Sequence, residues 1–386
     1  MRARLTLVLA VVVLAACGGA SPAASHSPSS QATSSAGAPA SPSGGATAAP
    51  SPSGSAGPAS LVHCTAAVPS GDNLVIGSVT GDPTVVVRDI QDPANAKNLC
   101  AFDPNALSPQ FVNASEVAYE TSGQQIIEAA LATGSTNVIA HYGAGINSGQ
   151  YSISPDGRSF TYVDGNAWHL VTSSGNRVLT TLPAAPNRGV NPDEDDSFLS
   201  YSPDGQYIAW FQTYHTGGSG ETAADQVRKA GDGSLAYSTS GMTMAVWASV
   251  PSRLFFRDAA GNVHRWDPTG GLSSMSSAHW IRPRSSPDGR WIAYTFRSTS
   301  AVGGIGFYSV QANSLSNTSP PGRAEVRFLN NDLVWYIGVQ ACSTCLGGQP
   351  SPTGVAYIYD IAGTSEISSR LAAVQDAWPH YTPPGP

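Results

Sequence analysis

The amino-acid sequence predicts an all-β fold, a single β-propeller of four-stranded blades that follows a disordered linker. Three observations lead to this prediction: a short motif that recurs along the chain, a regular spacing between its copies, and a low-complexity segment that separates the repeats from the N-terminus. The repeats occupy residues 61–386, and the segments before them indicate export.

The recurring motif is a polar turn followed by an alternating apolar strand that ends in an aromatic residue. Three copies contain the full turn sequence Ser-Pro-Asp-Gly, at residues 154–157, 202–205 and 286–289. Four weaker copies keep only the strand, and the strands of all seven copies end at Ile76, Tyr119, Tyr162, Trp210, Phe256, Tyr294 and Trp335. Successive strand ends are 38 to 48 residues apart, a period typical of propeller blades. Seven copies favour seven blades.

The Ser-Pro-Asp-Gly sequence suits a tight turn. Proline presets φ, aspartate hydrogen-bonds to the nearby backbone, and glycine accepts a positive φ. We therefore expect Asp156, Asp204 and Asp288 to be structural turn residues rather than catalytic ones.

The C-terminal segment Trp378-Pro379-His380-Tyr381 looks like the first strand of a blade without the remainder of that blade. Propellers commonly remove an open sheet edge by joining a terminal strand to the first blade. We expect this segment to pair with the strand near Leu74 and close the ring.

The repeat resembles that of TolB-like β-propellers, because it has Ser-Pro-Asp-Gly-x-x-Ile-Ala at residues 202–209 and 286–293 and a close variant at 154–161. The resemblance covers residues 61–386. TolB itself has six blades, so six blades are the alternative to the seven that the repeat count favours. Such propellers serve as binding scaffolds, sensor domains and accessory domains of enzymes, so the resemblance implies no single function.

The N-terminus has the layout of a secretion signal. Arg2 and Arg4 precede an unbroken apolar run at residues 7–16, which is too short to span a bilayer comfortably. Leu14-Ala15-Ala16-Cys17 then resembles the lipobox of bacterial lipoproteins. We expect residues 1–16 to be a cleaved signal peptide and Cys17 to be acylated, which would anchor the exported protein to the outer side of the cell membrane.

Residues 17–60 form the predicted linker. From residue 20 onward they are almost entirely Ser, Ala, Pro, Gly and Thr, with no aliphatic residue larger than alanine. Such a segment cannot bury enough apolar surface to offset its ordering entropy, so we expect it to be disordered.

The charge composition argues against nucleic acid as a partner, and the sequence lacks several common catalytic motifs. Only 12% of residues are charged, the net charge is −7, and lysine occurs only as Lys97 and Lys229. No basic patch that would neutralise phosphates is evident, so nucleic acid is not an expected partner. No G-x-S-x-G, H-E-x-x-H or P-loop pattern occurs, so we assign no catalytic residue and no cofactor. The sequence does not indicate an oligomeric state.

Four cysteines follow Cys17, namely Cys64, Cys100, Cys342 and Cys345. An even number in an exported protein favours disulfides, and four cysteines allow three connectivities. The Cys342-x-x-Cys345 pair is followed by a Gly- and Pro-rich loop rather than a helix, which favours a local disulfide over a redox site. By elimination, Cys64 would then pair with Cys100.

The lengths of the connections differ between the two faces of the predicted ring. If the strands of a blade are named a to d from the axis outward, the a–b and c–d turns share one face, here called the turn face. The b–c and d–a connections share the other, the loop face. The long connections fall on the loop face, at residues 141–150, 183–197, 213–223, 297–304 and 338–354.

Long loops on a rigid scaffold tend to carry binding, so the loop face is the candidate functional face. Its candidate residues are His141, Tyr142, Asp193, Asp195, Tyr214, His215 and Glu221. The acidic run at residues 193–196 could supply oxygen ligands to Ca²⁺, but it lacks the EF-hand spacing, and a solvated acidic loop is favoured.

The leading functional hypothesis is a non-catalytic binding scaffold that recognises a protein, peptide or envelope glycan through the loop face. The alternative is a small-molecule enzyme, a hydrolase or lyase, with its site at the mouth of the propeller channel. Convergent carboxylates and a histidine around that mouth would favour the enzyme.

Overall fold

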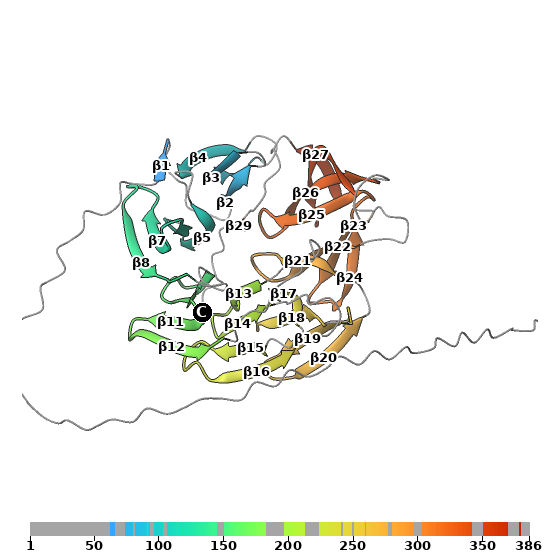
Figure 1. The fold of residues 1–386 in the computed structure, drawn as a ribbon. Helices are drawn as coiled ribbons and strands as arrows, with labels where there is room; N and C mark the ends of the chain where they lie inside the picture. The colour runs from blue at the N-terminus through green and yellow to red at the C-terminus, as the bar shows by residue number, and fades with distance from the viewer. Residues whose placement is uncertain are drawn as a thin grey trace, which may run out of the picture. The chain divides into compact units, whose positions relative to one another are not determined.

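The computed structural model describes residues 62–65, 74–79, 82–90, 92, 96–102, 106–113, 115–144, 150–182, 197–212, 224–240, 242–248, 251–258, 260–276, 280–296, 303–341, 350–369 and 378–379. The predicted signal peptide, Cys17 and the predicted linker lie outside these residues. The described residues contain β-strands and no helix, and the strands form seven antiparallel sheets arranged as a β-propeller (Figure 1).

The first blade is a sheet of five strands, in the order β1-β4-β3-β2-β29. Its strands are β1 (Val62–Cys64), β4 (Lys97–Phe102), β3 (Asp82–Asp89), β2 (Leu74–Val79) and β29 (Trp378–Pro379). In this blade β29 is the a strand, β2 to β4 are the b to d strands, and β1 extends the outer edge.

The other six blades each contain four strands that follow one another in the chain. Blade 2 has β5 (Leu107–Asn113), β6 (Glu116–Thr121), β7 (Gln125–Ala130) and β8 (Thr136–His141). Blade 3 has β9 (Tyr151–Ile153), β10 (Phe160–Asp164), β11 (Ala167–Thr172) and β12 (Gly175–Thr181). Blade 4 has β13 (Ser197–Tyr201), β14 (Tyr207–Gln212), β15 (Ala224–Lys229) and β16 (Leu235–Ser240).

Blade 5 has β17 (Thr243–Ala248), β18 (Arg253–Arg257), β19 (Val263–Asp267) and β20 (Gly271–Ser276). Blade 6 has β21 (Ile281–Ser285), β22 (Trp291–Phe296), β23 (Gly304–Ser309) and β24 (Ser314–Thr318). Blade 7 has β25 (Arg323–Phe328), β26 (Leu333–Gln340), β27 (Ser351–Asp360) and β28 (Ser365–Ser369).

All seven copies of the sequence repeat become the b strand of a blade. The seven strand ends identified in the sequence lie in β2, β6, β10, β14, β18, β22 and β26. The prediction of seven blades is therefore confirmed, and the six-blade alternative is wrong. These b strands are the apolar centre of each sheet, as in β10, where Thr161, Tyr162 and Val163 are all buried.

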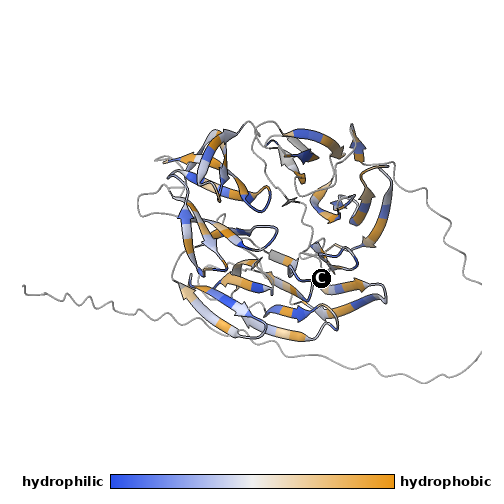
Figure 2. Ribbon diagram, turned by 180° about the vertical axis from the view of Figure 1, so that it is seen from behind, coloured by the Kyte–Doolittle hydropathy of each residue, from blue (hydrophilic) through white to orange (hydrophobic). Residues whose placement is uncertain are grey.

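The core is divided among the junctions between neighbouring blades. In the described part of the chain, each of the seven junctions has its own cluster of buried apolar side chains. Each fully buried large apolar side chain contributes about 1.5–3 kcal/mol relative to an exposed one. Figure 2 shows apolar residues alternating with polar ones along many blade strands, the pattern expected when successive side chains point to opposite faces of a sheet.

The ring closes through the C-terminal strand, as the sequence predicted. β29 pairs antiparallel with β2, and Trp378 lies opposite Ile76. At the junction with blade 7, Val75 of β2 packs with Trp335 and Ile358. Blade 1 is thus assembled from both ends of the described chain.

Four of the five predicted long connections were too long at one or both ends. β26 extends to Gln340 and β27 begins at Ser351, so the connection predicted at 338–354 is shorter. The Gly and Pro residues near these ends suggested a loop, but the hairpin continues through a bulge, with Gln340 opposite Ser351. In the same way His141 belongs to β8, Ser197 to β13 and Gly304 to β23.

Candidate functional site

The structure describes two of the seven predicted loop-face residues, His141 and Tyr142. The other five, Asp193, Asp195, Tyr214, His215 and Glu221, lie outside the described residues, as do Cys17, Cys342 and Cys345. His141 and Tyr142 lie at the start of the connection between blades 2 and 3.

Tyr142 is held beside a partly buried carboxyl group. β8 ends at the exposed His141, and the backbone N–H of Tyr142 then donates to the carbonyl of Gln124 in the b–c turn of blade 2. The Tyr142 hydroxyl donates to Glu120 Oε2 across 3.1 Å. Glu120 lies near the loop-face end of β6, opposite Leu107 of the inner strand β5.

Tyr151 closes the other side of this cluster. It is the first residue of β9, the inner strand of blade 3, and is 4% exposed. Its hydroxyl points across the blade junction to the carbonyl oxygens of Ser108, at 2.6 Å, and Ala118, at 2.8 Å, and donates its single proton between them. Glu120, Tyr142 and Tyr151 are named the Glu120 site below.

Burial sets the electrostatics of the Glu120 site. It raises the pKa of Glu120 from 4.5 to about 7, although the hydrogen bond from Tyr142 favours the carboxylate. Burial together with the nearby Glu120 charge raises the pKa of Tyr142 to about 12. The pKa of Tyr151 is also raised, first by burial and then by the charges of Glu120 and Tyr142. Glu120 therefore changes its protonation near neutral pH while both tyrosines keep their protons.

The connection that follows Tyr142 is fixed to blade 3. The backbone N–H of Gly143 donates to Asp164 Oδ1 across 2.5 Å. Asp164 is the last residue of β10, so it lies at the loop-face end of its blade. This bond positions Tyr142 over the junction of blades 2 and 3.

Four inner strands carry a strained residue near their loop-face ends. Ser108, Met244, Arg282 and Glu325 have φ values of 48°, 51°, 46° and 59°, and each coincides with a register shift. A positive φ is uncommon outside glycine, and such strain and bulges concentrate at functional sites, where they redirect side chains. Arg282 Nη1 lies 3.7 Å from Glu325 Oε1, which links blades 6 and 7.

The charges of the described inner strands lie in blades 6 and 7 alone. β21 and β25 together carry Arg282, Arg284, Arg323, Glu325 and Arg327. Arg323 is engaged in a bidentate pair with Glu366, at 2.9 and 2.7 Å. Within the described inner strands there is one carboxylate and no histidine, so these strands do not supply the constellation that would favour an enzyme.

On the turn face, the Ser-Pro-Asp-Gly side chains are fully engaged in their own turns. In each turn the serine hydroxyl donates to the aspartate at 2.6–2.7 Å, and the same carboxylate oxygen accepts the backbone N–H two residues on at 3.0–3.1 Å. The serine oxygen also accepts the backbone N–H five residues on at 2.9–3.0 Å. Asp156, Asp204 and Asp288 thus stabilise tight turns.

Two of these turns also join neighbouring blades. Asp204 accepts the backbone N–H of Ser252 in blade 5 across 3.2 Å, while its own N–H donates to the Ser252 hydroxyl across 3.2 Å. The N–H of Asp288 donates to Asn331 of blade 7 across 3.0 Å. The turn face is therefore closed by short, internally bonded connections.

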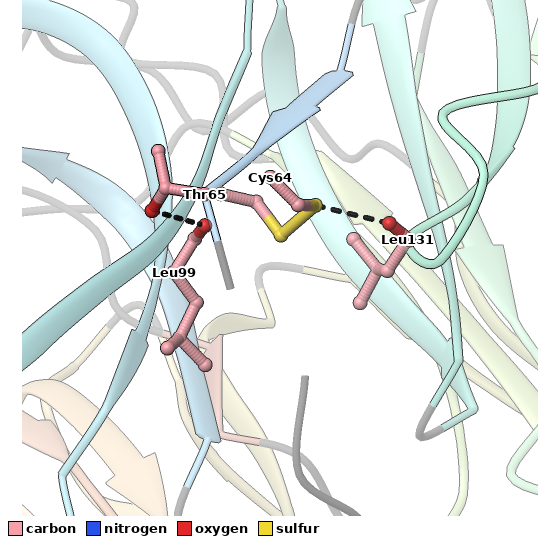
Figure 3. The surroundings of a disulfide bond; sticks show 5 residues. Cys64, Thr65, Leu99 and Leu131 are labelled. Carbon is pink, nitrogen blue, oxygen red and sulfur yellow. Dashed lines mark hydrogen bonds between the residues drawn. A yellow bond between two sulfur atoms is a disulfide. The ribbon is translucent and has the colours of Figure 1, made fainter. Parts of the chain in front are cut away.

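Cys64 and Cys100 form a disulfide between β1 and β4 (Figure 3). The two residues lie directly opposite each other in the strand pair and are 36 positions apart in the chain. Cys64 Sγ also lies 3.0 Å from the carbonyl oxygen of Leu131 in blade 2, a packing contact because a disulfide sulfur carries no proton. The disulfide secures the N-terminal strand to the outer edge of blade 1.

Within the described ranges, no group of three or more His, Cys, Asp or Glu side chains is arranged to hold a metal ion. The acidic run at 193–196 lies outside those ranges. No helix among the described residues is long and apolar enough to cross a membrane.

Sequence reasoning missed Glu120. It follows the aromatic residue of a weak repeat copy, where the pattern predicts a structural strand. The available signal was an acidic side chain at the end of an otherwise apolar run, Val117-Ala118-Tyr119. Its charge interacts with Tyr151, which begins the inner strand of blade 3 and follows 31 residues later.

Comparison with known proteins finds similar solved structures at low sequence identity. No family model and no curated protein matches this sequence. Similar solved structures include TolB from Acinetobacter baumannii, with 21% identity over 65% of this chain and 64% of that one, at a TM-score of 0.40. The β-propeller domain of Cps50 (Swd1) from Myceliophteria thermophila has 14% identity over 77% and 99%, at 0.47.

A third similar structure is an oligogalacturonate lyase from Vibrio parahaemolyticus, with 12% identity over 78% of this chain and 86% of that one, at a TM-score of 0.49. This chain covers less than two thirds of the TolB chain that it matches. Similarities at these identities and TM-scores assign no activity to this chain.

Proposed function

We propose that this protein is an exported lipoprotein, anchored through acylated Cys17, whose propeller is a non-catalytic scaffold that binds a protein, peptide or envelope glycan on its loop face. The Cys17 lipobox and the linker at 17–60 support the anchored location. The ring of seven blades supports the scaffold, because it presents loops from many blades on one rigid surface.

The difference between the two faces carries this proposal. On the turn face, the Ser-Pro-Asp-Gly carboxylates accept hydrogen bonds from their own turns. On the loop face, the Glu120 site holds an ionisable pair at a blade junction, and four inner strands carry strained residues. Rigid aromatic side chains such as Tyr142 bind partners at a low cost in conformational entropy.

Affinity capture from detergent-solubilised envelope, with the full-length protein as bait, tests this proposal. We expect wild-type protein to retain a defined partner and Tyr142→Ala to lose it. Asp332→Asn, on the turn face of blade 7, is the matched control and should retain the partner. If Tyr142→Ala retains the partner and turn-face variants lose it, the binding surface lies on the turn face and the proposal is wrong.

One observation favours the alternative, a small-molecule hydrolase or lyase. Glu120 has a pKa of about 7 and accepts a hydrogen bond from Tyr142, and a carboxyl group that titrates near neutral pH suits general acid–base catalysis. Turnover that follows Glu120 protonation and disappears in Glu120→Gln would establish the enzyme. Partner binding without turnover in wild-type protein establishes the scaffold.

A further inference from the structure

We propose that a cavity between blades 2 and 3 on the turn face binds a small organic ammonium ion that carries one aromatic or branched aliphatic group. The cavity lies at the opposite end of the blade junction from the Glu120 site. It is independent of the proposed loop-face function.

The cavity has the size and walls of a site for one apolar group. Its volume is about 210 Å³. An apolar cavity of about 150 Å³ holds benzene, whereas pockets for drug-sized ligands begin near 300 Å³. The apolar walls are formed by Val112 and Ile139 of blade 2 and by Ile153, Phe160 and Val171 of blade 3.

The strand register explains how blade 3 forms its wall of the cavity. Ile153, Phe160 and Val171 lie side by side across three neighbouring strands of blade 3. The floor is completed by Gly157, which has a φ of +68° and whose missing Cβ would lie 3.1 Å from the carbonyl oxygen of Val112. A larger residue at position 157 would therefore strain the turn and crowd the cavity.

The cavity contains one carboxylate, Glu128 of β7. Burial raises the pKa of Glu128, and the charge of Glu116 on the neighbouring strand raises it further. A cation inside the cavity would pair with the Glu128 carboxylate. This pairing would offset both the partial desolvation of Glu128 and its repulsion from Glu116.

The charges around the cavity are complementary to a cation. Arg158, also in the lining, interacts with Asp156 of the same turn. With Glu116 and Glu128, the group contains three carboxylates and one guanidinium. An anionic ligand would add to the negative excess, and a neutral one would bury Glu128 without a partner.

Titration of the full-length protein with benzylammonium and its neutral analogue benzyl alcohol tests this proposal, by calorimetry or by NMR shift changes at pH 7. We expect benzylammonium to bind at least about tenfold more tightly than the alcohol, which corresponds to about 1.4 kcal/mol. Glu128→Gln should remove this preference, because it should weaken the binding of benzylammonium and leave the affinity for benzyl alcohol unchanged. Asp332→Asn removes a distant carboxylate on the same face and should leave both affinities unchanged.

A second variant locates the site. Ser173 is exposed and lines the cavity from the c–d turn of blade 3. Ser173→Trp should therefore fill the entrance and lower the affinity for both probes. Equal affinities of the two probes for wild-type protein would overturn the proposal, and so would unchanged ammonium binding by Glu128→Gln. Unchanged binding of both probes by Ser173→Trp would show that they bind elsewhere.

Discussion

Glu120 makes the stability of the fold depend on pH. Its folded pKa of about 7 lies above the ordinary 4.5, so the folded state holds its proton more tightly than the unfolded chain does. Stability that this group contributes is complete below pH 4.5 and is lost as the pH rises through 7. At higher pH, the folded protein must keep a charged carboxylate in a partly buried position.

Glu120→Gln should remove this dependence. We expect the variant to gain stability relative to wild type between pH 5 and pH 8, by at most about 3 kcal/mol, which is the free-energy equivalent of the pKa change. Urea unfolding at the two pH values measures the difference. Glu325→Gln removes a carboxylate from an exposed position and controls for the loss of one charge. An equal gain for Glu120→Gln at both pH values contradicts the prediction.

Asp204 and Asp156 offer a matched pair for the turn residues. Both accept hydrogen bonds within their own turns, and Asp204 also accepts the Ser252 N–H of the next blade. Asp204→Ala should therefore destabilise the protein by about 1 kcal/mol more than Asp156→Ala, as measured by chemical unfolding, because it also loses the bond between blades. Neither variant should alter partner capture. Loss of partner with unchanged stability would instead make the turn face functional.

At the scale of whole elements, the C-terminal strand β29 is the simplest to remove. Truncation after Ser369 deletes the pairing of Trp378 and Pro379 with Ile76 and Val75 and leaves β2 as an open edge. We expect a loss of about 2 kcal/mol for the missing backbone hydrogen bonds and a greater tendency to associate through the exposed edge. Thermal unfolding and light scattering measure these two effects. An unchanged melting temperature would show that β29 contributes little to closure.

Replacement of residues 214–222, or separately 342–349, by a short Gly-Ser turn tests the loop face. The β circular dichroism and cooperative unfolding should stay largely intact, because loop closure entropy changes by only about 0.6 kcal/mol per doubling of length. Capture of the wild-type partner should weaken in both variants. Unchanged capture in both, with loss on mutation of the Ser-Pro-Asp-Gly side, would contradict the choice of face.

The blade architecture could be predicted from the sequence because each blade is encoded locally. Ser202-Pro203-Asp204-Gly205 and the following Ile208-Ala209-Trp210 specify a turn and its strand within nine residues. The Glu120 site and the Glu128 cavity could not be predicted, because each is made by side chains from two blades. Burial raises the pKa of Glu120, and Tyr151, whose pKa responds to the Glu120 charge, belongs to blade 3. A repeat pattern contains no information about such junctions.

For the molecule as a whole, the predicted lipid anchor at Cys17 can be tested with one substitution. Cys17→Ser removes the thiol that forms the thioether to lipid, so we expect the variant to lose acylation and to leave the membrane fraction. Fractionation and mass spectrometry of the N-terminus measure this outcome. A variant that still carries lipid and sediments with membranes would refute the assignment of Cys17.

The pairing of β29 with β2 also determines when the ring can close during synthesis. A ribosome releases residues 74–79 some three hundred residues before residues 378–379, so the first blade emerges without its inner strand. The disulfide partners Cys64 and Cys100 are both available early, whereas the ring waits for nearly the last residue of the described chain. The ring therefore closes only after residues 378–379 have been synthesised, and until then the first blade lacks its inner strand.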